Sequence, residues 1–189
     1  MPESSPKQHA PRVASLKTAR AAKRMRVAKA LGRSRLIEYR PKQGVVAYAR
    51  AVVRATPMER VELERHGIPG AVIKEVSKRI GVPAVRIFKI LGVPKATVEK
   101  KASGGQLLKG SGGLAAVGMI RLLGIAQELV ASSTAKGASE FDAAKWLGTW
   151  IERPQPALGG RRPSDLLDTP TGVEVVARLL GAIESGAYQ

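Results

Sequence analysis

Apolar residues recur along this chain at the spacing of amphipathic helices, and not in the strict alternation of a half-buried strand. The clearest stripe lies over about residues 171–183 and comprises Val173, Val176, Leu179, Leu180 and Ile183. A second stripe, over residues 70–80, comprises Val72, Ile73, Val76 and Ile80. Further helices are predicted over residues 56–66, 83–91, from 94 onward, 114–130, 140–150 and, briefly, 164–167. No segment requires a strand, so the predicted fold is all-α.

Capping and turn residues set several of these boundaries. The run Thr56-Pro57-Met58-Glu59 has the order of a capping box with proline in the first helical position, so a helix is predicted to begin there and to end at Gly67. Gly81 and Gly92 are predicted to end the next two helices. Within the helix over 83–91, the side chains expected to face inward are Val85, Phe88 and Leu91.

Two segments are less regular. Residues 103–113 (SGGQLLKGSGG) are rich in Gly and Ser, which predicts a loop or hinge. Residues 45–54 (VVAYARAVVR) are compatible with either a strand or a short helix, and their periodicity does not decide between the two.

The basic charge is concentrated in the first two thirds of the chain. Of a net charge of +17, residues 1–55 carry 14 Lys/Arg against 2 Asp/Glu, whereas residues 116–189 carry 7 against 8. Neutralising phosphates releases counterions, so this asymmetry favours a nucleic acid as partner over a merely soluble surface. We therefore expect a basic N-terminal extension (1–55), a DNA-binding domain (56–115) and a further helical domain with another role (116–189).

The extension itself has two parts. Residues 1–15 contain Pro and Ser with no apolar period and are predicted to be disordered. Residues 16–35 are rich in Ala, Lys and Arg and contain no acid, which suits a basic helix on DNA. An organelle transit peptide has a similar composition and is the alternative.

Several function classes are disfavoured by what the sequence contains. The chain has no Cys and only two His, His9 and His66, so neither a disulfide framework nor a zinc site is expected. It has no G-x-S-x-G motif, and GGQLLKGSGG lacks the order of a phosphate-binding loop. We expect no catalytic residues, no cofactor and no metal. No apolar run approaches the length of a membrane-spanning helix, so no membrane partner is expected.

A helix-turn-helix is predicted around Gly92. A glycine at the turn, followed six positions later by the branched Val98, is the spacing that packs the second helix of such a motif against the first. Phe88 stands where a small residue is usual and indicates a splayed crossing. The predicted DNA-binding residues are Arg86, Lys95, Thr97, Lys100 and Lys101. The alternative is a structural hairpin whose lysines are simply solvated.

The C-terminal third carries a distinctive order of motifs. Trp146-Leu147 is followed by Pro156-Ala157-Leu158-Gly159-Gly160, by Arg161-Arg162-Pro163, by Leu166-Leu167, by Gly172 and by Ile183-Glu184-Ser185-Gly186. This order resembles the toxin-binding domain of the Xre/ParS/MbcA antitoxins, which are partners of RES-domain toxins. The resemblance is strong over residues 140–189, looser over 60–135, and does not extend to 1–55. Independently of it, Trp146 and Trp150 lie four residues apart and can pack against Leu166 and Val176; Trp146, Leu147 and Leu167 are expected in the core.

The resemblance implies a function. Antitoxins of this kind form homodimers, repress their own operon, and cover a toxin that consumes NAD or transfers its ADP-ribosyl part, with the chain end in the toxin's pocket. They act in the bacterial cytoplasm, at the nucleoid. The toxin-binding residues it implies are Leu158, Gly159, Gly160, Arg161, Pro163, Leu179, Ile183, Gly186, Tyr188 and Gln189. The alternative is a stand-alone helix-turn-helix regulator or a nucleoid-associated protein without a toxin partner.

Overall fold

The computed structural model describes residues 36–134 and 137–184, and most of these residues are helical. The prediction of an all-α fold is confirmed. The helices are α2 (Gly44–Arg54), α3 (Pro57–His66), α4 (Gly70–Ile80), α5 (Ala84–Ile90), α6 (Lys95–Ser103), α7 (Gly110–Ser132), α8 (Ala143–Trp150) and α9 (Pro170–Glu184). Short 3-10 turns are η1 (Pro41–Gln43), η2 (Ala138–Glu140), η3 (Pro156–Leu158) and η4 (Pro163–Asp165). The predictions for residues 1–35 and 185–189 lie outside the described residues.

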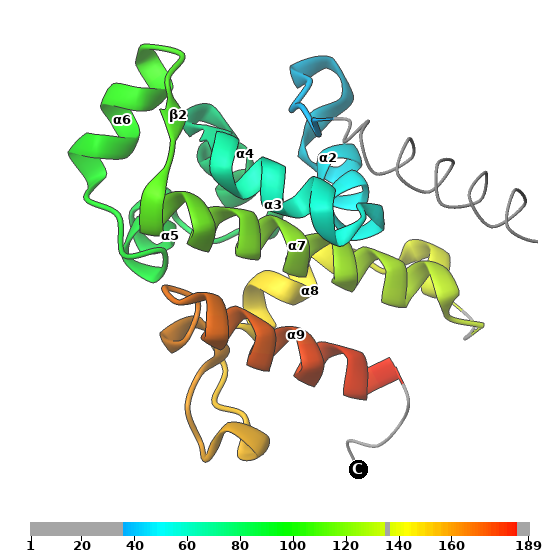
Figure 1. The fold of residues 1–189 in the computed structure, drawn as a ribbon. Coiled ribbons are helices and arrows are strands. Elements are labelled where there is room, and N and C mark those ends of the chain that lie inside the picture. The colour runs from blue at the N-terminus through cyan, green and yellow to red at the C-terminus, as the bar shows by residue number, and fades with distance from the viewer. Residues whose placement is uncertain (1–35, 135–136, 185–189) are drawn as a thin grey trace, which may run out of the picture. The chain divides into compact units, whose positions relative to one another are not determined.

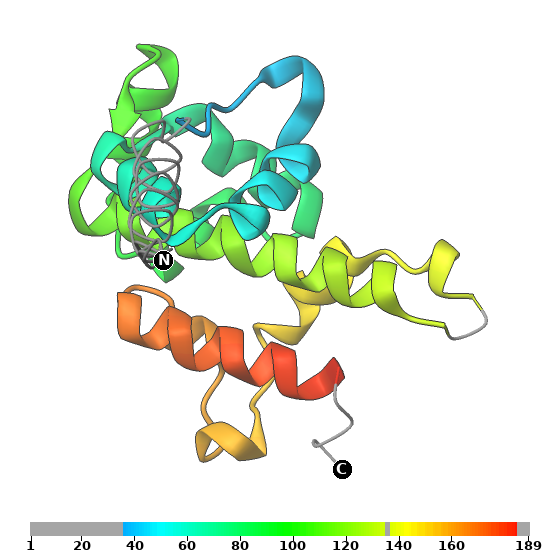
Figure 2. The ribbon, with the colours of Figure 1, turned by 45° about the vertical axis from the view of Figure 1, so that its right-hand side comes forward.

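Helix α7 lies at the centre of the described residues. In both Figure 1 and Figure 2 it runs across the middle, with α2 to α6 on one side and α9 on the other. Glycines allow the close approach: a Cβ on Gly124 would lie 2.4 Å from the carbonyl oxygen of Ala49 in α2, and a Cβ on Gly118 would lie 2.5 Å from Val173 in α9. Small residues therefore bring α2 and α9 against α7 at the expense of its intrinsic helix propensity.

The glycine-rich segment differs from its prediction. Residues 103–113 were expected to form one loop, but α7 already begins at Gly110. Added Cβ atoms on Gly112 and Gly113 would lie 2.4 Å from Val93 and 2.7 Å from the carbonyl oxygen of Leu108. These glycines allow the first turn of α7 to pack closely against its neighbours. The segment between α6 and α7 comprises only residues 104–109. Within them, Leu107–Leu108 (β2) pairs antiparallel with Ile68–Pro69 (β1).

Helix α7 also corrects the expectation drawn from apolar run length. Among the described residues it is the one helix long and apolar enough to cross a membrane, with a mean hydropathy of 1.6 over its most apolar window. Most of that window is buried inside the protein, and the helix contacts α2, α3, α8 and α9. Its apolar character is accounted for by its place in the core.

Several helices have the boundaries and buried faces that neighbouring residues along the sequence predicted. Thr56 and Glu59 form the predicted capping box at the start of α3, and Gly67 ends that helix. The four apolar residues of α4 are buried, and Gly81 follows in the left-handed conformation. Residues 45–54, left open between strand and helix, lie in α2 and contribute Val45, Tyr48, Ala49 and Val52 to the core.

One inward-facing prediction is wrong. Phe88 and Leu91 are buried, but Val85 is 60% exposed. Helix α5 is only seven residues long, and its inward face is carried by Ile87, Phe88 and Ile90. Two turns give too few apolar positions to fix the phase of a helix. The described residues form one compact unit, in which α2 packs with α4 and α7 although it falls within the predicted extension 1–55.

Candidate functional site

Residues 84–103, the α5–α6 hairpin, have the turn that the sequence predicted. Gly92 has a φ of 62°, a conformation that favours glycine, and the backbone N–H of Val93 donates to the carbonyl of Phe88 at 2.9 Å. Val98 is completely buried and is the only residue of α6 that is. Lys95, Ala96, Glu99 and Lys100 of α6 are exposed and are open to a partner.

The predicted DNA-binding residues of α6 divide between two faces. Thr97, Lys100 and Lys101 are spaced i, i+3, i+4 and share a face, with Lys100 nearly opposite the buried Val98. Lys95 lies apart from them, in the first turn, and its ammonium is 3.7 Å from the carboxylate of Glu99.

The side chains on the shared face are not equally available. Lys100 is exposed, whereas Thr97 is half-buried. The ammonium of Lys101 donates to the backbone carbonyl of Leu107 at 3.0 Å, which holds it against the base of the hairpin. Lys95 and Lys100 are therefore the most accessible cations of α6.

Arg86 has a different environment from the α6 residues. Its guanidinium donates to both carboxylate oxygens of Glu152, at 2.7 and 2.8 Å, and to the hydroxyl of Ser164 at 3.3 Å. The hydrogen bond that Arg86 donates to Glu152 lowers the pKa of Glu152 and raises the pKa of Arg86. Arg86 thus connects α5 to the segment after α8, and we leave it out of the proposed DNA interface.

A second arginine holds the other end of α8. The guanidinium of Arg79 in α4 lies 2.7 and 3.0 Å from the two carboxylate oxygens of Asp142, which also caps α8 by accepting from Ala144 and Lys145. Burial raises the pKa of Asp142, but the hydrogen bonds from Lys145 and Arg79 outweigh it and the pKa is lowered. Helix α8 begins after this cap and not at residue 140.

Between α8 and α9 the chain forms a reversal over residues 155–163, the 155–163 turn. Gln155 is buried at its base, where its backbone N–H donates to Arg161 and its carbonyl accepts from Leu158 and Gly160, each at 3.0 Å. Its side-chain amide donates to the carbonyls of Trp150 and Arg153. Gly159 and Gly160 have φ of 63° and 78°. A single buried glutamine therefore organises the turn.

The predicted toxin-binding residues are not all presented to a partner. Gly159, Gly160 and Arg161 are exposed and Leu158 is half-buried, so the tip of the turn is accessible. Pro163 and Leu179 are buried and act within the protein's own core, and Ile183 is half-buried in the last turn of α9. The residues Gly186, Tyr188 and Gln189 lie outside the described residues.

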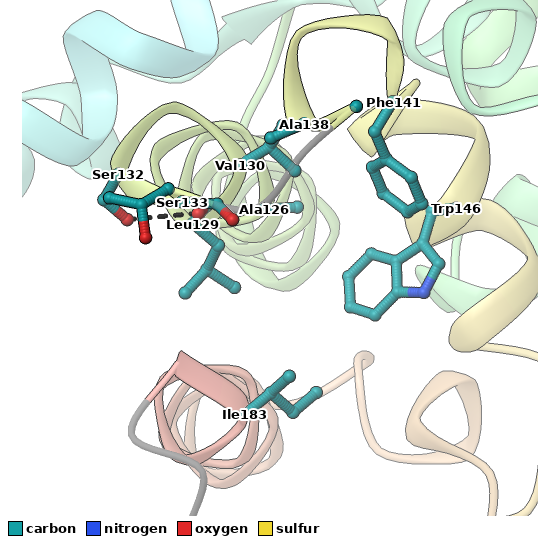
Figure 3. A pocket seen from close by; sticks show the side chains of 11 residues that line it. Ala126, Leu129, Val130, Ser132, Ser133, Ala138, Phe141, Trp146 and Ile183 are labelled. Carbon is teal, nitrogen blue, oxygen red and sulfur yellow. Dashed lines mark hydrogen bonds between the residues drawn. The ribbon is translucent and has the colours of Figure 1, made fainter.

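Sequence reasoning missed an apolar groove. A hollow of about 650 Å³ lies between the end of α7, the start of α8 and the last turn of α9 (Figure 3). Phe141, Trp146 and Ile183 point into it from three separate segments. Leu147 and Leu167 are buried as expected, whereas Trp146 is only half-buried and stacks on Trp150 at 5.8 Å. No local pattern marks such a groove, because its walls come from distant parts of the chain.

The described residues do not gather into a metal centre: no group of three His, Cys, Asp or Glu side chains among them could hold an ion. Of the two histidines, His66 is exposed at the end of α3 and His9 lies outside the described part of the chain. The described residues form three surfaces suited to binding: the cationic helix α6, the 155–163 turn and the apolar groove.

Comparison with known proteins connects these surfaces to a family. Residues 139–186 match the family model of the antitoxin Xre/MbcA/ParS C-terminal toxin-binding domain. Over 140 residues the chain is 36% identical to a protein of Sphingobium sp. (strain YBL2) named "Prs ADP-ribosylating antitoxin". That alignment covers 74% of this chain and 86% of the relative, so it extends well beyond the matched domain. The matched domain contains α8, the 155–163 turn and α9.

Proposed function

This chain belongs to the Xre/MbcA/ParS antitoxin family, and we propose that it neutralises a RES-domain toxin through its C-terminal domain and represses its own operon by binding DNA. The observation that carries the first part is the match of α8, the 155–163 turn and α9 to a toxin-binding domain. The relative's name joins ADP-ribosylation to an antitoxin. We propose ADP-ribosyl transfer, and not simple NAD breakdown, as the reaction of this chain's toxin.

The 155–163 turn is the first proposed contact with the toxin. Its base is fixed by Gln155 and Pro163, so the exposed tip can be held in one conformation before binding. Pre-organisation of this kind lowers the ordering cost of association. Arg161 presents a cation at the tip that an acidic or phosphate-bearing surface could accept.

The test uses the protein encoded by the adjacent gene, co-expressed with this chain. We expect the two to co-elute in size exclusion and NAD consumption by the neighbour to be suppressed in the complex. Arg161→Ala should weaken the complex, whereas Lys89→Ala, which removes an exposed cation on α5, should not. A neighbour that does not co-elute would favour the alternative, a stand-alone regulator.

The chain end is a second proposed contact, through Gly186, Tyr188 and Gln189. A tyrosine ring offers a stacking surface to a pocket shaped for a dinucleotide. Ending the chain after Ser185 should restore NAD turnover more than it raises the dissociation constant, because the turn and α9 remain. Complete inhibition by the shortened chain at equal occupancy would assign the blocking role to the turn or to α9.

DNA binding is supported by charge and by the exposure of α6. Neutralising phosphates gives an affinity that falls steeply with salt, and the first helical turn of a recognition helix commonly reaches base edges. The proposed contacts are Lys95, Thr97, Lys100 and Lys101, with Lys95 in the first turn and Lys100 most exposed.

The matching experiment measures affinity for the chain's own upstream DNA over a range of salt concentrations. Replacing Lys95 and Lys100 together with Ala should cost about 1–3 kcal/mol for each specific contact and reduce the salt slope. Replacing Lys145 and Arg153 together with Ala removes the same number of exposed charges away from α6 and is the control. Unchanged affinity and slope in the double variant would refute the assignment of α6.

Repression of an operon by such a hairpin usually requires two copies that read two half-sites. We therefore propose a homodimer within a toxin–antitoxin complex, acting at the nucleoid in the bacterial cytoplasm. Analytical ultracentrifugation of the free protein and of its DNA complex tests the dimer, which a monomeric mass in both states would exclude.

A further inference from the structure

Of the described residues that line the apolar groove between α7, α8 and α9, the sequence assigned only Ile183 to toxin binding. Its lining residues are Ala126, Leu129, Val130, Ser132, Ser133, Thr134, Gly137, Ala138, Phe141, Trp146 and Ile183. None of these described residues carries a charge, although the chain as a whole has a net charge of +17. Its volume of about 650 Å³ falls within the range of sites that receive a ligand or a few side chains.

The groove has an aromatic wall that is held from behind. Phe141 is 48% exposed, and its ring centroid lies 6.2 Å from that of Trp146. Trp146 in turn stacks on Trp150, which is 8% exposed and belongs to the core. Figure 3 shows Phe141 and Trp146 on one side of the hollow, with Ile183 and Leu129 across from them. A partly exposed aromatic backed by a buried one is a rigid surface of the kind that forms hot spots in interfaces.

We propose that this groove receives an apolar segment of the toxin, as a contact surface in addition to the 155–163 turn and the chain end. The inference rests on the proposed function. Phe141, Trp146 and Ile183 all lie within residues 139–186, the part of the chain that matches a toxin-binding domain, and the other lining residues belong to α7 and the segment that follows it. The serines and threonine at the end of α7 supply a polar rim around an apolar centre, as protein interfaces do.

Two other occupants fit less well. DNA would gain no phosphate contact from an uncharged lining. A second copy of this chain would have to offer a projecting apolar ridge to a concave surface. The large exposed apolar side chains outside the groove, among the described residues, lie singly on three helices: Met58 on α3, Val85 on α5 and Val175 on α9.

The first experiment compares two substitutions of exposed apolar residues in the matched domain. Phe141→Ser removes the aromatic wall, whereas Val175→Ser is a matched control on α9, 41% exposed and outside the groove. Neither side chain is buried, so both variants should fold. We expect Phe141→Ser to raise the dissociation constant for the protein encoded by the adjacent gene by about tenfold or more, and Phe141→Leu to recover much of the loss. Equal affinities for Phe141→Ser and Val175→Ser would overturn the proposal.

The second experiment identifies the occupant. The chain has two tryptophans, Trp146 in the groove and Trp150 behind it, so 5-fluorotryptophan labelling gives two 19F resonances, assigned with Trp146→Phe. Addition of the unlabelled neighbour should shift the Trp146 resonance and not that of Trp150. A Trp146 shift on concentrating the free protein, or on adding operator DNA, would give the groove to a second copy or to DNA and overturn the proposal.

The two experiments keep this inference separate from the proposed function. A wild-type chain that fails to bind the neighbour at all contradicts the proposed function. A wild-type chain that binds tightly, with Phe141→Ser binding equally well and the Trp146 resonance unmoved, contradicts the groove alone.

Discussion

Replacing Glu152 with Gln should separate the contribution of the Arg86–Glu152 ion pair from the rest of the fold. The carboxylate accepts two hydrogen bonds from Arg86 and lies 3.8 Å from the guanidinium of Arg162. The substitution keeps the shape of the side chain and removes its charge. Ser164 also contacts Arg86 and Glu152. The substitution should therefore weaken the contact between α5 and the residues that flank the 155–163 turn.

The magnitude follows from the exposure of the two side chains. Arg86 is 30% and Glu152 is 26% exposed, so the pair is neither free in solvent nor sealed in the core. Exposed pairs contribute up to about 1 kcal/mol, and breaking a buried pair costs about 3–5 kcal/mol. We expect Glu152→Gln to lower the free energy of unfolding by about 1–3 kcal/mol, which for a chain of this size lowers Tm by roughly 2–10 °C.

Urea unfolding followed by circular dichroism measures the effect, in a double-mutant cycle with Arg86→Met. The coupling energy should be about 1–2 kcal/mol in low salt and smaller in high salt. The hydrogen bond from Arg86 holds the pKa of Glu152 below its usual value, so its stabilising effect is fully present above the pKa of an unfolded Glu and is lost as pH falls through the folded pKa. The wild type and Glu152→Gln should therefore begin to converge in stability as pH falls below about 4, and should be equal once pH is below the lowered pKa of Glu152.

A coupling energy near zero in low salt would refute this reasoning. So would a stability difference that persists unchanged into acid, because an interaction that depends on the Glu152 carboxylate cannot survive its protonation.

Other expectations follow from packing and charge. Gly148→Ala should lower the free energy of unfolding by at least about 2 kcal/mol, because its Cβ would lie 2.0 Å from the carbonyl oxygen of Ile80. Gly181→Ala, whose Cβ would have nothing within 4 Å, should raise the free energy of unfolding by about 0.5–1 kcal/mol. Urea unfolding compares the two variants, and an equal effect would contradict the close contact at Gly148. Val85→Ser should change stability by less than about 0.5 kcal/mol in the same assay, since the side chain is exposed. Deleting residues 1–35 should weaken binding to all DNA sequences alike and flatten its salt dependence, while a retained Tm would show that the remaining unit is intact.

The parts of the fold that sequence could predict are those set by neighbours along the chain. The capping box at Thr56 and the apolar stripe of α4 are local, and both were predicted correctly. Gly112 was misread because glycine signals a loop when considered alone, whereas its role depends on Val93, which lies nineteen residues earlier and packs against it. The phase of α5 was misread because seven residues define no clear stripe.

The sites follow the same division. The turn at Gly92 and the reversal at Gly159–Gly160 are local and were anticipated. The pairing of Arg86 with Glu152 joins residues 66 positions apart, so nothing in the local sequence separates Arg86 from the other cations that were predicted to bind DNA. Gln155 carries no signal that separates it from an ordinary loop glutamine, and only its burial shows that it organises the turn.

The packing of α8 against α4 bears on how such proteins can diversify. Gly148 brings the two backbones together at Ile80, and an arginine from α4 or α5 holds each end of α8. If a lineage exchanged only residues 116–189 with a homologue, the glycine contact and the two ion pairs between α8 and the helices α4 and α5 would no longer match. Recombination should therefore be tolerated when everything from residue 36 onward moves as one cassette, and the α5–α6 hairpin and the 155–163 turn should tend to be inherited together.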